Sequence, residues 1–244
     1  MSASFKLTGV FVLALIDVIG TIAILQRANQ EPSGGAARGA NAVASEYLVR
    51  NDSHRLGTSE NDQVTIVEFL DFECEACLAM FPTMERLRAD YAGEITFVVR
   101  YFPLPGHPNS MTAALAVEAA AQQGAFEPMY RKMYETQEQW GHTQASRRST
   151  FVEYARELGL NIDQFEKTMD DPATKARVQR DIDDGTALGV SGTPTIYING
   201  VETASMPSYE SMAATIDAVL DEQATHRPNG RAYRVAGFGA RAQE

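Results

Sequence analysis

The longest run of hydrophobic residues lies near the N-terminus, over residues 7–25. It contains one charged side chain, Asp17. As a helix with a rise of about 1.5 Å per residue, this run would span roughly 28 Å, which matches the hydrocarbon core of a bilayer. The run is longer than the ~7–15 apolar residues of a cleavable signal peptide. The pattern therefore predicts a single transmembrane helix within an N-terminal membrane anchor, residues 1–27.

Two polar segments flank a central region that has the spacing of a folded core. Residues 28–62 are mostly small and polar, which predicts a linker. Residues 224–244 combine arginine, glycine and alanine without any core periodicity, which predicts a disordered tail. The folded domain is therefore expected over residues 63–223.

The domain opens on a strand, a helix and a second strand. Residues 64–72 are almost continuously apolar or β-branched, as in a strand buried on both faces. From Cys74 to Tyr91 the hydrophobic residues recur every three or four positions, which predicts a helix with one buried face. A second strand pattern covers residues 95–102. Because a helix joins the two strands, parallel pairing is expected.

Helical patterns then fill about residues 106–188, and strand signals return at Thr195. This last strand reaches Asn199-Gly200, a dipeptide that is a strong signal for a β-hairpin turn. A final helix is expected from Ser208. The order of elements predicts an α/β domain interrupted by a helical insertion.

Composition narrows the class of function. Hydrophobic residues make up 44% of the chain and charged residues 22%, which is ordinary for a globular protein. The net charge of −11 and the absence of a basic stripe argue against nucleic-acid binding. The chain has only two cysteines, so any thiol chemistry lies between them.

Cys74 and Cys77 form a Cys-x-x-Cys motif where the first strand gives way to the helix. Free N–H groups and the dipole at a helix N-terminus stabilise a thiolate, so Cys74 is the expected nucleophile. Cys77 lies one turn later and can attack a mixed disulfide formed on Cys74. The sequence thus predicts a redox-active disulfide that needs no cofactor.

The acidic residues beside the motif bear on its redox poise. Glu73 and Glu75 flank Cys74 in sequence, and two nearby carboxylates are expected to raise the pKa of its thiol. A less stable thiolate makes the couple less oxidising. We therefore expect a redox potential below the roughly −120 mV of the strongest periplasmic oxidants.

A Cys-x-x-Cys pair also occurs in zinc sites and in structural disulfides. A zinc site needs two further ligands, and the chain offers only scattered histidines, His54, His107, His142 and His226. No metal is therefore expected. His107 follows the second strand and is within reach of the cysteine site, but a helix-entry role is the favoured interpretation. A structural disulfide would close a loop so short that it removes little entropy from the unfolded chain.

Three more residues are candidates for the site. Glu68 lies in the strand pattern six residues before Cys74, where it could exchange protons with Cys77 through a raised pKa. The alternative is an acid at the surface of the sheet. Thr193-Pro194 precedes the later strand, and proline at such a place marks an edge strand or a cis turn.

These motifs together resemble the DsbA-like branch of the thioredoxin superfamily. The resemblance covers about residues 64–220 and is greatest to membrane-anchored, extracytoplasmic members. It is carried by residues 68–82 around the cysteines, Tyr101-Phe-Pro-Leu104, His107-Pro108 and Gly192-Thr-Pro-Thr195. It implies a thioredoxin-like fold in which Glu68 is the buried proton-transfer acid. It also implies that Pro194 is cis and that Thr193 lines the substrate groove.

The resemblance implies a protein-disulfide oxidoreductase on the extracytoplasmic side of the cell membrane. It would introduce disulfides into reduced or unfolded secreted proteins, and a quinone-linked thiol oxidase of the membrane would reoxidise it. Because residues 28–62 are too short for a dimerisation domain, a monomer is expected. The best-known oxidases have Pro-His between the cysteines where this chain has Glu75-Ala76. Two alternatives therefore stay open: a reductase fed by a membrane electron carrier, and a non-catalytic peptide-binding holdase.

Overall fold

The structure is a computed structural model that describes residues 46–59 and 63–225. The expected anchor over residues 7–25, Asp17 and residues 226–244 of the tail lie outside these ranges. Within the described ranges, no helix is both long and apolar enough to span a bilayer.

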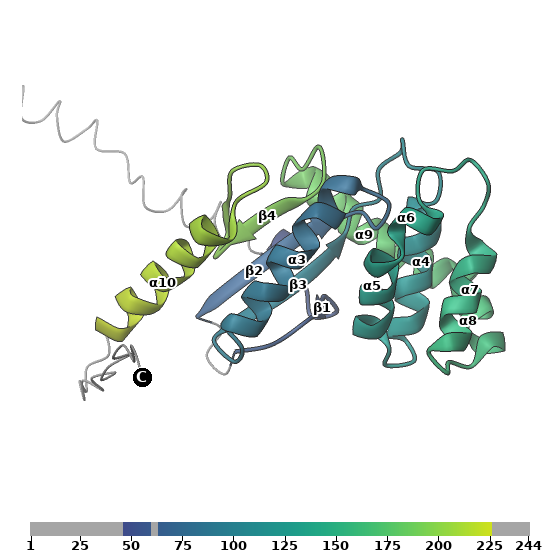
Figure 1. The fold of residues 1–244 in the computed structure, drawn as a ribbon, viewed down its shortest axis with the longest axis horizontal. Helices are drawn as coiled ribbons and strands as arrows, with labels where there is room; N and C mark the ends of the chain where they lie inside the picture. Colours follow the sequence, from purple (N-terminus) through teal and green to yellow (C-terminus); the bar gives the residue numbers. More distant parts are fainter. Residues whose placement is uncertain (1–45, 60–62, 226–244) are drawn as a thin grey trace, which may run out of the picture. The chain divides into compact units, whose positions relative to one another are not determined.

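A five-stranded mixed sheet forms the centre of the domain, in the order β1-β3-β2-β4-β5 (Figure 1). The parallel pairing predicted for the first two strong strands is confirmed, since β2 and β3 align Val64 with Ile95 and Leu70 with Tyr101. On the other side of β2, β4 runs antiparallel. The strands are β1 (His54–Arg55), β2 (Val64–Leu70), β3 (Ile95–Tyr101), β4 (Thr195–Ile198) and β5 (Val201–Glu202).

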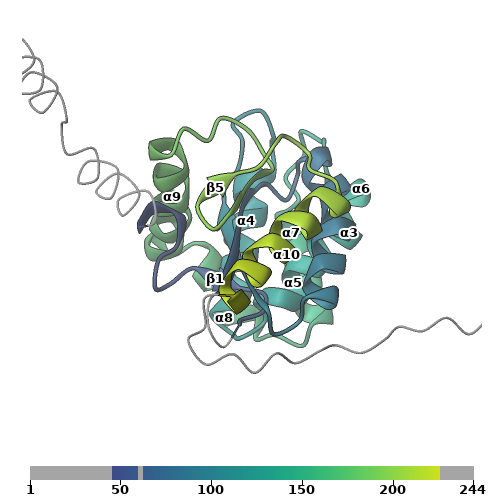
Figure 2. The same cartoon turned by 90° about the vertical axis from the view of Figure 1, so that its left-hand side faces the viewer.

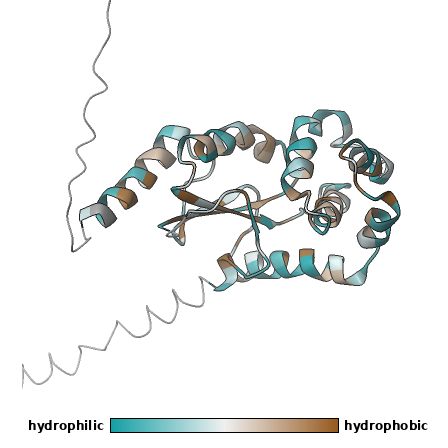
Figure 3. Cartoon of the chain, turned by 90° about the horizontal axis from the view of Figure 1, so that it is seen from below, coloured by the Kyte–Doolittle hydropathy of each residue, from teal (hydrophilic) through white to brown (hydrophobic). Residues whose placement is uncertain are grey.

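Helices cover both faces of the sheet (Figures 2 and 3). One face packs against α3 (Glu75–Asp90) and α10 (Tyr209–Thr225), whose Met84 and Met212 belong to the larger hydrophobic core. The opposite face packs against α9 (Pro172–Ala187). A close approach there requires Gly185, because a Cβ at that position would lie 2.8 Å from the ring of Phe102.

The predicted helical insertion is a group of helices beside the sheet (Figure 1). Its apolar faces meet in the larger core together with α3. The helices are α4 (Ser110–Ala121), α5 (Phe126–Glu135), α6 (Gln137–Trp140), α7 (Arg148–Glu157) and α8 (Ile162–Met169), after which α9 returns to the sheet.

Residues 46–59, which the sequence analysis placed in the linker, pack onto the sheet. Arg100 of β3 is fully buried and donates hydrogen bonds of 2.7 Å to the carbonyl oxygens of Tyr47 and Leu48. Its guanidinium also pairs with Asp181 of α9 at 2.7 Å. Residues 54–55 form the edge strand β1, and Leu56 is 2% exposed. The sequence pattern did not identify residues 46–59 as part of the domain, because the segment is mostly polar and only a few separated residues in it are buried.

Candidate active site

Cys74 lies at the N-cap of α3 and Cys77 lies in its first turn. The helix begins here because Cys74 has an extended backbone conformation, with a φ of −78° and a ψ of 124°. Cys74 keeps 6% of its surface exposed, whereas Cys77 keeps 1%. Cys74 is therefore the more accessible of the two sulfur atoms.

The pKa of Cys74 is lowered to about 5, chiefly by a hydrogen bond from the Cys77 thiol. Burial opposes this effect, but the Thr193 hydroxyl and the backbone N–H groups of Ala76 and Cys77 also favour the thiolate. The prediction that nearby carboxylates raise this pKa is therefore wrong. The N-terminus of α3 and the neighbouring donors outweigh the acids.

The two acids do not act on Cys74 as their position in the sequence suggested. Glu73 is fully buried, and its carboxylate accepts hydrogen bonds from the backbone N–H groups of Asn109 at 2.6 Å and His142 at 2.8 Å. The side chain of Glu75 is 70% exposed and pairs with His142 Nε2 at 3.1 Å. Backbone N–H groups of Asn109 and His142 thus balance the charge of Glu73. Solvent and the His142 side chain balance the charge of Glu75.

Cys77 and Glu68 lie on the same buried side of the sheet. Glu68 is 2% exposed and lies between Ile66 and Leu70 on the face of β2 that packs against the larger core, of which Cys77 is a member. Burial raises the pKa of Cys77 well above its usual value. Burial also raises the pKa of Glu68 to about 8, and the charges of Glu85 and Cys74 add to the effect. Glu68 is therefore a buried acid and not a surface acid, and its charge acts on Cys77, the predicted resolving cysteine.

The loop before β4 faces the cysteines from the other side. The peptide bond between Thr193 and Pro194 is cis. The neutral Cys74 thiol donates a hydrogen bond of 3.4 Å to the Thr193 carbonyl. The Thr193 hydroxyl is buried without a partner in the described part of the chain, so it remains a donor for the thiolate. Thus the loop before β4 and the N-cap of α3, distant in sequence, meet at one sulfur atom.

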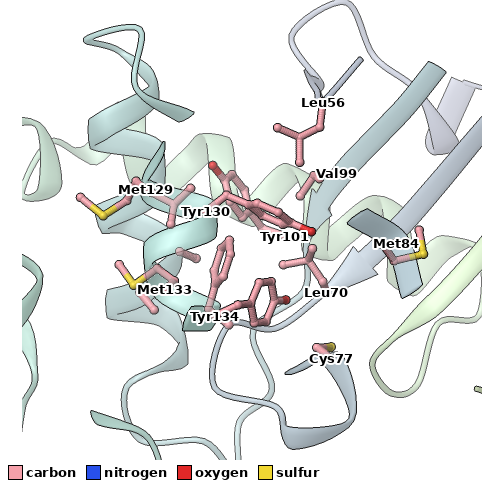
Figure 4. Close-up of a cluster of buried hydrophobic side chains, with 14 of the residues drawn as sticks. Leu56, Leu70, Cys77, Met84, Val99, Tyr101, Met129, Tyr130, Met133 and Tyr134 are labelled. Carbon is pink, nitrogen blue, oxygen red and sulfur yellow. The ribbon is translucent and has the colours of Figure 1, made fainter. Parts of the chain in front are cut away.

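The insertion closes the buried side of the motif with aromatic rings. Tyr134 of α5 packs between Phe72 and Phe81, at ring-centroid distances of 5.3 and 5.1 Å. Figure 4 shows Tyr134 pointing from α5 toward the region of Leu70 and Cys77. This wall keeps bulk water away from Cys77, which is the reason that its thiol resists ionisation.

A buried glutamine ties the insertion to the backbone of the motif. Gln137 of α6 is 2% exposed, and its Nε2 donates to the carbonyl oxygens of Phe72 at 2.8 Å and Cys74 at 3.0 Å. The insertion therefore holds the main chain on both sides of Glu73. In residues 46–59 and 63–225, no three histidine, cysteine or acidic side chains are gathered as a metal site would require.

The sequence profile of the thioredoxin family matches residues 50–218 of this chain. The chain belongs to the thioredoxin family. It shares its fold with solved thioredoxin-fold proteins, although identity to them is low. A thioredoxin-like oxidoreductase from Silicibacter pomeroyi is 24% identical, with a TM-score of 0.61 over 72% of this chain and 97% of that one. BdbD from Bacillus subtilis is 23% identical, with a TM-score of 0.62 over 69% and 93%.

Curated relatives of this thioredoxin-family chain are longer proteins. A protein named Na⁺/H⁺ antiporter NhaA from Herminiimonas arsenicoxydans is 38% identical over 162 residues, which are 66% of this chain and 24% of that protein. Na⁺/H⁺ antiporter NhaA 3 from Salinispora tropica is 34% identical over 168 residues, which are 68% and 24%. The chain thus spans about a quarter of the length of these relatives.

Sequence reasoning found the residues of the thioredoxin motif and missed those that support it. Asp71, Gln137 and His142 lie in loops or in a four-residue helix, where no periodicity marks them. His142 has a φ of 55°, a conformation that is uncommon outside glycine and tends to mark functional sites. His107, interpreted from the sequence as a helix-entry residue, binds Asp71 at 2.6 Å.

Proposed function

We propose that this chain is an extracytoplasmic, membrane-anchored dithiol oxidase that introduces disulfides into reduced or unfolded secreted proteins. The observation that carries the proposal is the contrast between the two thiols. The pKa of Cys74 is lowered to about 5, while that of Cys77 is raised. A stable thiolate on the accessible sulfur favours the reduced form and so makes the disulfide an oxidant.

The reaction begins with the Cys74–Cys77 disulfide. A client thiolate attacks the Cys74 sulfur, the S–S bond breaks, and Cys77 leaves as a thiolate that takes a proton from Glu68. A second client thiolate then attacks the client sulfur of this mixed disulfide, and Cys74 leaves as a thiolate. The client loses two electrons and the cysteine pair gains them. A quinone-linked membrane thiol oxidase would remove them again.

The geometry supports a place for Thr193 and Pro194 in client binding. The Thr193 carbonyl accepts a hydrogen bond from the Cys74 thiol, and the Thr193 hydroxyl favours the Cys74 thiolate. An extended client strand placed along the loop would bring its own sulfur to Cys74. Thr193 would then serve both the client and the thiolate.

The lowered pKa of Cys74 also favours an intermediate redox potential. Cysteines of this type have a pKa of about 7 in thioredoxin and about 3.5 in DsbA, with potentials of about −270 and −120 mV. A pKa of about 5 lies between these limits. We therefore expect a potential between them, which keeps the sequence-based expectation of a weaker oxidant than the strongest known.

A membrane location is supported by two observations. The sequence has an apolar run at residues 7–25 that is long enough to span a bilayer. In relatives named Na⁺/H⁺ antiporters, a stretch similar to this chain is part of a larger protein whose name denotes membrane transport. A domain of this type is thus joined to a membrane protein elsewhere.

The decisive experiment follows oxidation of a reduced dithiol peptide by the oxidised full chain. We expect stoichiometric oxidation and its loss in Cys74→Ala. Cys77→Ala, first converted to its mixed disulfide with glutathione at Cys74, should exchange glutathione for a single-cysteine peptide and retain that peptide as a mixed disulfide. A potential near or below about −270 mV would instead make the chain a reductase. If peptide binding survives in Cys74→Ala and no thiol exchange occurs in the unaltered chain, the holdase alternative replaces this proposal.

A further inference from the structure

Two histidines border the cysteine motif, although neither lies between the cysteines. His107 lies between β3 and α4, and His142 follows α6. Their rings meet edge to face, with centroids 5.8 Å apart. The dipeptide between the cysteines, Glu75-Ala76, offers no positive charge of its own. Any side-chain cation at the motif must therefore come from elsewhere in the fold.

A buried carboxylate holds His107 in place. Its Nδ1 lies 2.6 Å from Asp71 Oδ2, and the side chain of Asp71 is completely buried. Backbone N–H groups of Glu73 and Leu104 donate to the same carboxylate at 2.8 and 2.9 Å. The Asp71 carboxylate is therefore held by two backbone hydrogen bonds, and it holds the His107 imidazole in turn.

Asp71 also forms a hydrogen bond with Cys74. The backbone carbonyl of Asp71 accepts a hydrogen bond from the Cys74 N–H at 3.2 Å. Asp71 is thus bound to the imidazole through its side chain and to the nucleophile through its main chain. A shift of either group would have to move the other.

His107 and the Cys74 thiolate act on each other through their charges. The groups that face it are Asp71, Glu73 and Cys74 from the segment after β2, and His142 from the segment after α6. Glu73 is occupied by two backbone N–H groups, and His142 pairs with Glu75. Burial lowers the pKa of His107, but Asp71 and the charges of Cys74 and Glu73 raise it above its usual value.

We propose that the His107 imidazolium, positioned by Asp71, stabilises the Cys74 thiolate through its charge and thereby sets the oxidising strength of the couple. This inference rests on the proposed oxidoreductase function and adds to it a residue outside the motif. His107 acts across space on the sulfur, and Asp71 is a positioning residue.

The coupling between the two groups must be reciprocal. If the imidazolium stabilises the thiolate, the thiolate stabilises the imidazolium by the same free energy. Oxidation to the disulfide removes the thiolate charge, so His107 should lose its proton at lower pH in the oxidised chain than in the reduced chain. Between these two pH values, reduction takes up an additional fraction of a proton.

This difference can be measured without altering the site. Nuclear magnetic resonance of the full chain in detergent micelles would follow the histidine ring signals with pH, in the reduced and the oxidised state. The signal of His107 is assigned by elimination with His54→Gln, His142→Gln and His226→Gln. We expect its pKa to fall on oxidation. The same pKa in both states would overturn the inference.

A second measurement uses variants with a matched control. In a Cys77→Ala background, the ultraviolet absorbance of the thiolate gives the pKa of Cys74. We expect His107→Gln to raise it by about one unit, a tenfold change in the ionisation constant, and His107→Lys to restore most of the shift. His54 also pairs with a carboxylate at 2.6 Å, but that partner is Glu118 of α4, so His54→Gln should leave Cys74 unchanged.

The outcomes separate this inference from the function on which it rests. If the unaltered chain oxidises dithiols but His107→Gln leaves the pKa of Cys74 unchanged, the role of His107 is refuted and the function stands. If His107 shifts that pKa but the unaltered chain oxidises no dithiol, the electrostatic coupling stands and the proposed function fails.

Discussion

Cys74 and Cys77 lie within one helical turn of each other, yet their surroundings drive their acidities apart. Cys74 meets donors from Cys77, Thr193 and the helix N-terminus, whereas Cys77 faces the hydrophobic core. In the sequence the nearest charged neighbours are Glu73 and Glu75, which suggested the opposite sign for Cys74. Proximity along the chain was therefore a poor guide to electrostatics, because the fold turns Glu73 toward other donors.

Glu68 gives a prediction at this scale. Burial raises its pKa from 4.5 to about 8, so the folded chain holds a proton that the unfolded chain releases. Stability should therefore fall as pH rises from 4.5 to 8. Glu68→Gln removes this cost, and we expect it to stabilise the reduced chain by about 2 to 3 kcal/mol at pH 7, measured by urea unfolding.

The same substitution should slow catalysis, because Cys77 loses its proton donor. A matched control is Glu138→Gln, an exposed acid on α6, which should change stability by less than about 0.5 kcal/mol. A gain in stability that is equal at pH 4 and pH 8 would contradict the assignment of the raised pKa to Glu68.

Thr193 gives a second prediction. Its hydroxyl is a buried donor without another partner among the described residues, and it favours the Cys74 thiolate. A hydrogen bond to a charged group contributes about 1.5 to 3 kcal/mol, so Thr193→Val should raise the pKa of Cys74 by about one to two units. The couple should become less oxidising, as titration against glutathione would measure. Thr193→Ser, which keeps the hydroxyl, should stay close to the unaltered chain.

At the scale of elements, the short helix α6 supports the motif through one side chain. Gln137 donates to the carbonyl oxygens of Phe72 and Cys74, and the Cys74 oxygen also accepts a hydrogen bond of 3.1 Å from the Leu78 N–H of α3. The insertion is therefore more than a cover for the core. It fixes the backbone that presents the nucleophile.

Gln137→Leu tests this role. It removes the Gln137 donor from the Phe72 carbonyl and leaves the Cys74 carbonyl with the Leu78 N–H alone, which should cost about 1 to 3 kcal/mol of stability. Amide hydrogen exchange should also accelerate locally at residues 72–77. Gln122→Leu is the matched control, because the Gln122 amide makes only a long contact of 3.4 Å with Thr174. Equal losses in the two variants, without local exchange at the motif, would refute a specific role for α6.

At the scale of the whole molecule, the fold recruits residues that the sequence assigned to a linker. Arg100 is buried, and its charge is balanced by Asp181 and Asp184 on α9. The remaining donors reach the carbonyl groups of Tyr47 and Leu48. Without residues 46–59, one of these guanidinium nitrogens would lose both of its partners inside the protein.

Two fragments test this boundary. A fragment of residues 46–225 should unfold cooperatively, and a fragment of residues 63–225 should be less stable by several kcal/mol. The loss arises because Leu48 and Leu56 each bury a side chain worth about 1.5–3 kcal/mol and because Arg100 loses its carbonyl partners. Urea unfolding measures the difference. Equal urea midpoints for the two fragments would show that residues 46–59 add no stability and belong to the linker.

The sequence by itself determined the parts that depend on local pattern. The strand at residues 64–72, the helix that follows Cys74, the parallel second strand and the Asn199-Gly200 hairpin each have a periodicity or turn signal, and the structure confirms them. Cys74 and Cys77 were evident because no other cysteine exists. The proline at position 194 was marked by its motif, and its peptide bond is cis.

Only the tertiary structure decided which groups surround the sulfur atoms. Thr193 is 119 residues from Cys74 along the chain, and Gln137 is 63 residues away, yet both contact it. His107 and His142 reach the motif from loops, whose residues follow no hydrophobic period. Local pattern specifies an element, because burial of one face is a property of neighbouring residues. The acidity of Cys74 depends on distances between segments that only the packed fold brings together.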